Sequence, residues 1–121
     1  LIAAVLATDE MRDMVEVARQ VGIDVLVETH DEAEVERSLE LAVDMIGVNQ
    51  RDLVTFEVDH ARAMRMASVI PSEVLRIAES GVRDAKDARN LRDVGFDAVL
   101  VGESLLVSGA PSRAVADLRV S

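Results

Sequence analysis

The sequence predicts an α/β fold in which parallel strands are joined by crossover helices. Short apolar runs alternate along the chain with segments whose apolar residues recur at helical spacing, as in successive β-α-β units. The chain has no Trp or Tyr and two Phe, so Val, Leu, Ile, Ala and Met must fill the core, which suits buried parallel strands. Five such strands fit either an open doubly wound sheet or part of a (β/α)8 barrel.

The first predicted strand is the continuous apolar run Leu1–Ala7. Thr8 is in a position to cap the helix that follows, and Gly22 is a typical helix stop. The run begins without Met and inside a predicted strand. We therefore expect this chain to be a segment of a longer protein.

The second and third predicted strands are Ile23–Glu28 and Met45–Val48. Between them lies a helix that Asp31 can cap, because Glu34 follows three residues later in the pattern of a capping box. Residues 49–52 form a polar cluster directly after the third strand.

The segment 53–58 predicts a loop or a short extended piece. Asp59 can cap the next helix and Pro71 can end it. Val74–Glu79 is the fourth predicted strand, and it is followed by a turn and a helix that begins at Asp84 and ends at Gly95.

The last predicted strand is Ala98–Val101. Gly102–Leu106 predicts a short helix or turn, and Pro111 suits the first turn of a terminal helix. No linker or low-complexity segment interrupts the pattern. We therefore expect residues 1–121 to form one domain.

The charge balance limits the classes of partner. The chain carries 23 acidic and 13 basic residues, a net charge of -10, which argues against a nucleic-acid partner and against an anionic membrane surface. No apolar run approaches the roughly 18 residues that a membrane span needs. The absence of Cys excludes disulfides and thiolate metal sites, and His30 and His60 are isolated. We expect a cytoplasmic protein without a metal or cofactor.

Polar residues interrupt the apolar pattern at the carboxyl ends of the predicted strands, where parallel α/β folds carry out chemistry. They are Glu28, His30, Asn49, Arg51, Glu79, Ser80, Glu103 and Ser104. Two of these ends, 79–81 and 102–104, combine Gly with Ser. Two adjacent strands that end in this way would direct backbone N–H groups and hydroxyls to one point, an arrangement that holds phosphate.

Structural explanations of the same residues remain open. Glu28 could cap the next helix or pair with an arginine, and His30 could be a loop or cap residue. Asn49 could stabilise a turn through its side chain, and Arg51 could form a surface ion pair with Asp52. The glycine-containing ends could be turns that need an unusual backbone angle.

Four sequence blocks follow one another along the chain. They are V-L-V-E-T-H at 25–30, I-G-V-N-Q-R-D-L at 46–53, I-A-E-S-G-V at 77–82 and A-V-L-V-G-E-S-L at 98–105. Together they strongly resemble the indole-3-glycerol phosphate synthase family of (β/α)8 barrels. The resemblance covers the whole chain. It implies the C-terminal half of a TIM barrel, from about the fourth strand to the end, with the N-terminal half absent.

The resemblance implies a carboxy-lyase of tryptophan biosynthesis. Members of the family close the indole ring of 1-(2-carboxyphenylamino)-1-deoxyribulose 5-phosphate, with loss of carbon dioxide and water. Glu28 and Asn49 match catalytic positions, and Glu28 takes part in proton transfer. Asn49 and Arg51 match the pair that holds the substrate near its anthranilate carboxylate, and Glu79 matches a residue that contacts the sugar-chain hydroxyls. The matching phosphate-binding residues are Ser80, Gly81, Gly102, Glu103 and Ser104.

The chain also departs from the family pattern. The family has two essential lysines and a further glutamate on its first three strands, whereas the one lysine here, Lys86, falls in a late helix. We therefore expect this chain alone to bind phosphate without turning over substrate. Thr29 stands where Val is common, and Ala42 stands where a helix-ending Gly is common.

Two alternatives follow from the same residues. An open half-barrel leaves unpaired strand edges, so the chain could be a non-catalytic fragment that self-associates or complements its missing half. The chain could also be another phosphate-sugar barrel enzyme, such as phosphoribosylanthranilate isomerase, although the N-Q-R-D-L block argues against this.

Overall fold

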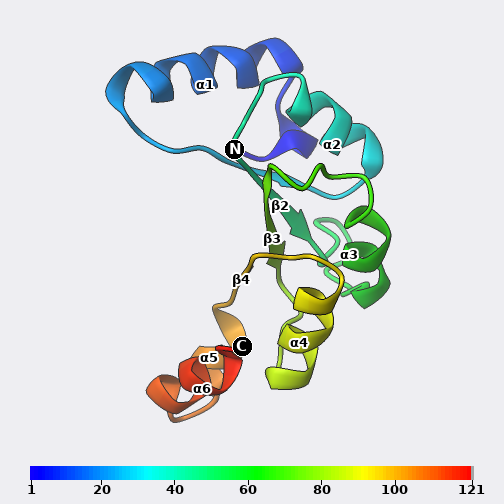
Figure 1. Cartoon of the computed structure of the whole chain (residues 1–121), viewed down its shortest axis with the longest axis vertical. Coiled ribbons are helices and arrows are strands. Elements are labelled where there is room, and N and C mark those ends of the chain that lie inside the picture. The colour runs from blue at the N-terminus through cyan, green and yellow to red at the C-terminus, as the bar shows by residue number, and fades with distance from the viewer. Residues whose placement is uncertain (121) are drawn as a thin grey trace.

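In the computed structural model, which describes residues 1–120, the chain forms a parallel four-stranded sheet in the order β1-β2-β3-β4. Every neighbouring pair of strands is parallel, and a helix connects each strand to the next (Figure 1). The strands are β1 (Leu26–Thr29), β2 (Met45–Asn49), β3 (Leu75–Glu79) and β4 (Ala98–Leu100). The predicted α/β class with parallel strands is confirmed.

The crossover helices α2, α3 and α4 follow one another along one side of the sheet, and α5 and α6 lie together beyond β4 (Figure 1). Among the described residues, no helix combines the length and apolar character needed to cross a membrane. The helical segments are η1 (Ala3–Val5), α1 (Thr8–Val21), α2 (Glu32–Leu39), α3 (His60–Met66), α4 (Ala85–Asp93), α5 (Glu103–Val107) and α6 (Pro111–Leu118).

The predicted first strand is wrong for most of its length. Only Ile2 makes a parallel bridge, to Glu28, and the chain then turns into the 3-10 helix η1. The Arg37 guanidinium binds the carbonyl oxygens of Ala3 at 2.8 Å and Leu6 at 3.2 Å. These carbonyls therefore face α2 instead of a neighbouring strand.

Two of the three predicted helix caps, Asp31 and Asp59, are confirmed, and Asp84 caps the helix that it was expected to begin. The Asp31 carboxylate accepts a hydrogen bond from the Glu34 amide at 2.8 Å, and Asp59 and Asp84 cap α3 and α4 in the same way. Thr8 is instead the first residue of α1, and the Glu10 carboxylate binds the Ala7 amide in front of it at 2.8 Å.

The two faces of the sheet have different neighbours. One face carries Val27, Ile46, Val48 and Ala78, all with 0% exposure, and forms the core beneath the helices. The opposite face carries the residues that alternate with these along each strand. There Leu75 and Leu100 remain 49% and 55% exposed, so the described helices leave this face largely uncovered.

The structure accounts for the two departures at Thr29 and Ala42. Thr29 is fully buried, and its hydroxyl donates to the Gly47 carbonyl oxygen at 2.8 Å, so the polar atom is satisfied. Ala42 has a φ of 51°, in the left-handed region that favours glycine. Alanine therefore occupies a position where glycine would be less strained.

Candidate active site

The sheet register brings three predicted site residues to the uncovered face. Glu28 pairs with Gly47 on β2, and Asn49 pairs with Glu79 on β3. A Cβ atom at Gly47 would collide with the Glu79 carboxylate. Because Gly47 has no side chain, the Glu79 carboxylate can lie over β2, on the side of Glu28.

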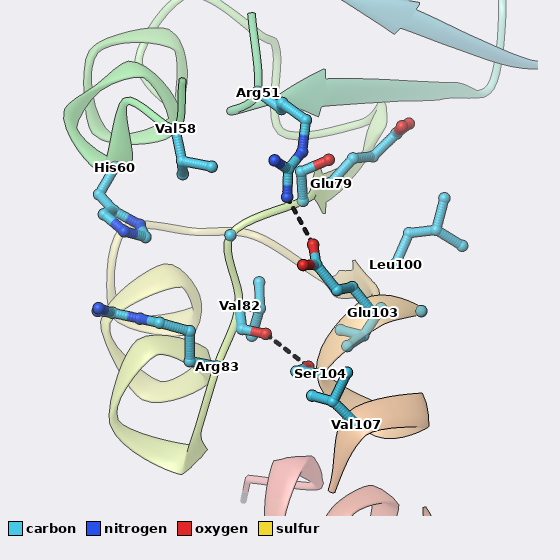
Figure 2. Close-up of a pocket in the computed structure, with 14 residues that line it drawn as sticks. Arg51, Val58, His60, Glu79, Val82, Arg83, Leu100, Glu103, Ser104 and Val107 are labelled. Carbon is cyan, nitrogen blue, oxygen red and sulfur yellow. Dashed lines mark hydrogen bonds and ion pairs between the residues drawn. The ribbon is translucent and has the colours of Figure 1, made fainter. Parts of the chain in front are cut away.

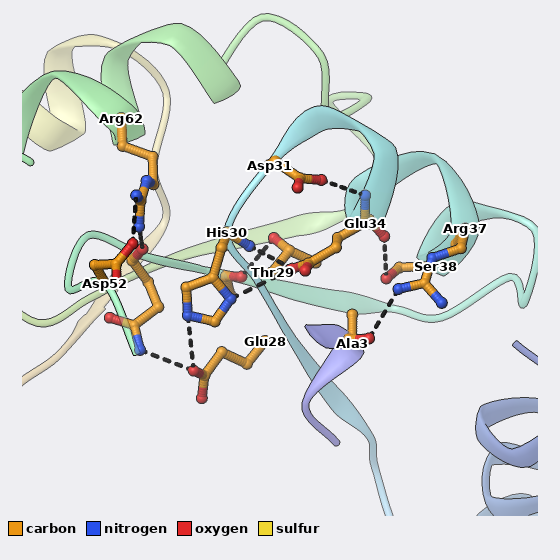
Figure 3. A network of polar contacts seen from close by, with 12 residues as sticks. Ala3, Glu28, Thr29, His30, Asp31, Glu34, Arg37, Ser38, Asp52 and Arg62 are labelled. Atoms are coloured by element: carbon orange, nitrogen blue, oxygen red, sulfur yellow. Dashed lines mark hydrogen bonds and ion pairs between the residues drawn. The ribbon is translucent and has the colours of Figure 1, made fainter. Parts of the chain in front are cut away.

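Glu28 has polar neighbours on two sides, and one of them, Asn49, hydrogen-bonds to its carboxylate. The Asn49 side-chain amide donates to Glu28 Oε1 at 2.8 Å, and His30 Nε2 lies 3.4 Å from the same oxygen. Glu34 in α2 fixes the histidine, because its Oε2 lies 3.3 Å from His30 Nδ1 and accepts from the His30 amide at 2.7 Å. Figure 3 shows this chain of contacts from α2 to Glu28. The Glu28 carboxylate is thereby oriented before any ligand binds.

Glu79 is the carboxyl group with the most altered acidity at this site. Glu79 is 5% exposed. Its pKa is raised to about 7, mainly because the carboxyl group is buried and secondly because Glu28 carries a negative charge nearby. Within the described residues, Glu79 Oε1 is buried and has no hydrogen-bond partner. A carboxyl group that exchanges its proton near neutral pH is suited to proton transfer.

A cavity of about 810 Å³ lies at the carboxyl ends of β3 and β4. It is bounded by the turn after β3, the start of α5 and side chains from the segment after β2 (Figure 2). Its lining includes Arg51, Val58, His60, Glu79, Ser80, Gly81, Arg83, Gly102, Glu103 and Ser104.

The turn at one side of the cavity has a constrained backbone. Ser80 and Gly81 have φ values of 63° and 69°. A Cβ at Gly81 would lie 2.5 Å from Val58 Cγ1 and 3.2 Å from His60 Cε1, so this position requires glycine for its backbone angle and for space. The side-chain amide of Gln50, a residue 2% exposed, donates to the Ser80 carbonyl oxygen at 2.8 Å and holds the turn.

The other side of the cavity is the start of α5. The Ser104 hydroxyl donates to the Val82 carbonyl oxygen at 2.9 Å, which ties α5 to the turn after β3. The first amides of a helix have no partners within that helix. The amides of Glu103 and Ser104 are at the start of α5, and both residues line the cavity. This arrangement can bind an anionic group.

Comparison with known proteins assigns the chain to a family. A model of the family described as indole-3-glycerol phosphate synthase matches residues 1–118. The chain belongs to the indole-3-glycerol phosphate synthase family. The resemblance in the four sequence blocks is thereby confirmed.

Relatives with this name are similar over almost the whole chain. An indole-3-glycerol phosphate synthase of Ruminiclostridium cellulolyticum is 42% identical over 121 residues, which are 100% of this chain and 46% of that relative. One of Mycobacterium ulcerans is 48% identical over 118 residues, covering 98% of this chain and 43% of the relative. The chain thus spans less than half the length of these two relatives.

Solved structures support the fold alone, since their sequence identity is low. 3-Hexulose-6-phosphate synthase from Salmonella typhimurium matches 98% of this chain and 57% of its own, with a TM-score of 0.80 and 17% identity. The BexX/CysO complex of Amycolatopsis orientalis gives a TM-score of 0.70 at 17% identity, over 93% of this chain and 47% of that chain.

The structure divides the predicted site residues into two neighbouring groups. Glu28 and Asn49 form the hydrogen-bonded pair on β1 and β2. The other predicted site residues line the cavity, and Glu79 lies between the two groups. The cavity-lining set is Arg51, Glu79, Ser80, Gly81, Gly102, Glu103 and Ser104.

Three of the structural explanations have an outcome. Gly81 does have an unusual backbone angle, with a φ of 69°, whereas Gly102 has a φ of -125°. Asn49 does stabilise the local turn, because its Oδ1 accepts from the Arg51 amide at 2.9 Å, while its amide group binds Glu28. The predicted surface ion pair between Arg51 and Asp52 is wrong. Arg51 instead binds Glu103 at 2.7 Å.

Sequence reasoning missed three residues that shape the site. Glu34 was expected only as part of a cap, yet its carboxylate lies 3.3 Å from the ring of His30, the residue in front of the α2 cap. Gln50 gave no signal besides its place in the polar cluster. His60 seemed isolated in sequence, yet its ring lies against Gly81 at the cavity.

Proposed function

We propose that this chain is the C-terminal part of an indole-3-glycerol phosphate synthase, with residues 1–121 forming one partial barrel from about the fourth strand to the end. The complete protein would be a carboxy-lyase of tryptophan biosynthesis. It would close the indole ring of 1-(2-carboxyphenylamino)-1-deoxyribulose 5-phosphate with loss of carbon dioxide and water. The family match and the relatives' names support this proposal.

The single observation that carries the proposal is the Glu28–Asn49–Glu79 group beside a cavity whose rim is formed by two glycine-containing turns. In this assignment Glu28 transfers protons during ring closure and dehydration. Asn49 orients the Glu28 carboxylate through the 2.8 Å hydrogen bond. Glu79 binds the sugar-chain hydroxyls, and its pKa of about 7 lets it donate as well as accept at neutral pH.

The remaining roles follow from the cavity. Arg51 would bind the anthranilate carboxylate, since a guanidinium matches a carboxylate with two hydrogen bonds. The phosphate would lie between the two turns, held by Ser80 and Gly81 on one side and by residues 102–104 on the other. A fixed phosphate uses binding energy at a remote point to orient the reacting end.

A chimera tests the proposal. Residues 1–121 would replace the matching segment of the Ruminiclostridium cellulolyticum relative, and formation of indole-3-glycerol phosphate would be followed by fluorescence. We expect turnover in the chimera and none in the isolated chain. Glu28→Gln should lower turnover by about 100-fold or more, while Glu36→Gln, an exposed change on α2, should leave it unchanged. A folded chimera without activity would contradict the proposal.

A second candidate function is self-association, and the uncovered face supports it. Leu100 is 55% exposed on the edge strand β4, and Leu106 and Val107 in α5 are 82% and 78% exposed. Apolar surface beside an open strand edge favours pairing with another chain. Light scattering on the isolated chain would show a stable dimer if this candidate is right and a monomer if it is wrong.

A further inference from the structure

Arg51 is a cation of the cavity whose guanidinium already has an anionic partner within the same cavity. Its Nη2 lies 2.7 Å from Glu103 Oε2, and its Nη1 donates to the Phe56 carbonyl oxygen at 3.1 Å. Figure 2 shows Glu103 reaching from α5 across the cavity to Arg51. The partner is therefore a carboxylate, the same group that an anionic ligand of Arg51 would present.

Arg83, a second arginine at the cavity, differs in this respect. It is bound by Asp87 through two contacts, at 2.8 and 3.1 Å, and Asp87 is outside the cavity lining. Glu103, by contrast, is itself a lining residue. A ligand that binds Arg51 in the cavity therefore competes with Glu103 for the guanidinium.

The pair is weak enough to open. The Glu103 side chain is 76% exposed and the Arg51 side chain 32% exposed. Pairs with this exposure are screened by water and contribute little. Rotation of the Glu103 side chain into solvent would free Nη2 of Arg51 without any movement of the backbone at 102–104.

We propose that Glu103 is an internal competitor for Arg51. Its carboxylate binds the guanidinium and must be displaced by the carboxylate of an incoming ligand, so Glu103 lowers the affinity of the cavity for carboxylates. The inference rests on the proposed function in taking Arg51 as a substrate-binding residue. It gives the Glu103 side chain a role that is separate from any phosphate contact of its backbone.

The test is the affinity of the 121-residue chain for 2-aminobenzoate, measured by calorimetry. Glu103→Gln should bind 2-aminobenzoate up to about five-fold more tightly, the factor that corresponds to the upper value for an exposed ion pair. Glu73→Gln changes the net charge equally at an exposed position before β3 and should leave the affinity unchanged. The double variant Arg51→Gln/Glu103→Gln should not bind 2-aminobenzoate more tightly, because removal of Glu103 increases the affinity only by freeing Arg51.

Three results would overturn the inference. They are equal or weaker binding of 2-aminobenzoate by Glu103→Gln, an equal gain in Glu73→Gln, and absence of binding in every variant. Urea midpoints of all variants establish that they are folded. The outcome is distinguishable from failure of the proposed function. An active chimera combined with no gain in Glu103→Gln removes only the inference, and an inactive chimera combined with a gain removes only the function.

Discussion

The carboxyl ends of β1 and β2 hold their functional groups in a different way from the ends of β3 and β4. At β1 and β2 the groups are side chains, and Glu28 is oriented by the hydrogen bond that it accepts from Asn49. At β3 and β4 the shape comes from the backbone, with left-handed angles at Ser80 and Gly81 and the start of α5 opposite them. The first region is suited to proton transfer and the second to holding an anion.

The difference determines which substitutions each region should tolerate. Side chains in the first region interact through charge and burial. Changes of pH and Glu→Gln substitutions, which remove a charge but keep the shape, should therefore affect this region most. The second region depends on space and backbone angle, so the addition of a methyl group should affect it most. Glu79 is part of both, because it faces Glu28 and also lines the cavity.

The largest expected effect is on the backbone of the second region. Gly81→Ala adds a left-handed alanine and a contact of 2.5 Å with Val58, and should lower the free energy of unfolding by roughly 2–4 kcal/mol. Gly22 is the matched control, since it has a φ of 73° and no atom within 4 Å of an added Cβ. Gly22→Ala should cost only about 1–2 kcal/mol. Equal losses in urea unfolding would show that the contact with Val58 does not matter.

The second expected effect is the pH dependence that Glu79 imposes on the first region. Folding raises the pKa of Glu79 from 4.5 to about 7, so the folded state binds the proton more tightly. The contribution of protonated Glu79 to the free energy of unfolding is fully present below pH 4.5 and is lost as the pH rises through 7. The full loss should be roughly 3 kcal/mol.

Glu79→Gln should remove this loss. We expect the free energy of unfolding, measured with urea, to fall less between pH 4.5 and pH 8 in the variant than in the wild type. Glu73→Gln, at an exposed position, controls for the overall charge. If Glu79→Gln and Glu73→Gln show the same pH dependence, Glu79 does not titrate in the expected range.

A third measurement separates the two causes of the Glu79 shift. Glu28→Gln keeps an oxygen that can accept from Asn49 and removes the negative charge. The pKa of Glu79, followed by carbon NMR of its carboxyl group, should fall below about 7 and stay above 4.5, because burial is the larger cause. An unchanged pKa would mean that Glu28 exerts no charge effect on Glu79.

The smallest expected effect is the loss of one hydrogen bond between the two cavity walls. Ser104→Ala removes the 2.9 Å bond to the Val82 carbonyl oxygen and should lower the free energy of unfolding by about 0.5–1.5 kcal/mol. Ser108→Ala removes two exposed local bonds, one donated to the Leu105 carbonyl oxygen and one accepted from the Ala110 amide, and should have a smaller effect because water can replace both. A larger loss in Ser108→Ala would contradict the role of Ser104 as a tie.

The α/β class, four of the five predicted strands and the polar residues at their ends were predictable from the sequence. Asp31, Asp59 and Asp84 act as caps because side-chain hydrogen bonding to nearby amides is a local property. The polar residues at strand ends were predictable because parallel strands place all their carboxyl ends at one edge.

The contacts across the sheet could not be predicted from the sequence. The space at Gly47 that admits the Glu79 carboxylate depends on the register between β2 and β3. Arg51 pairs with Glu103, a residue 52 positions away. The sequence alone favoured an ion pair between Arg51 and Asp52, because these two residues are adjacent. The apolar run at the N-terminus had the composition of a strand, yet Arg37 binds its carbonyl oxygens from α2.

The most direct test of the account is a titration of the chain with inorganic phosphate, followed by amide NMR shifts. We expect the amides of Gly81, Gly102, Glu103 and Ser104 to shift together along one binding curve, while those near Glu28 and His30 stay unchanged. Shifts confined to other parts of the chain, or no saturable shift at these four amides, would contradict a phosphate site at the ends of β3 and β4.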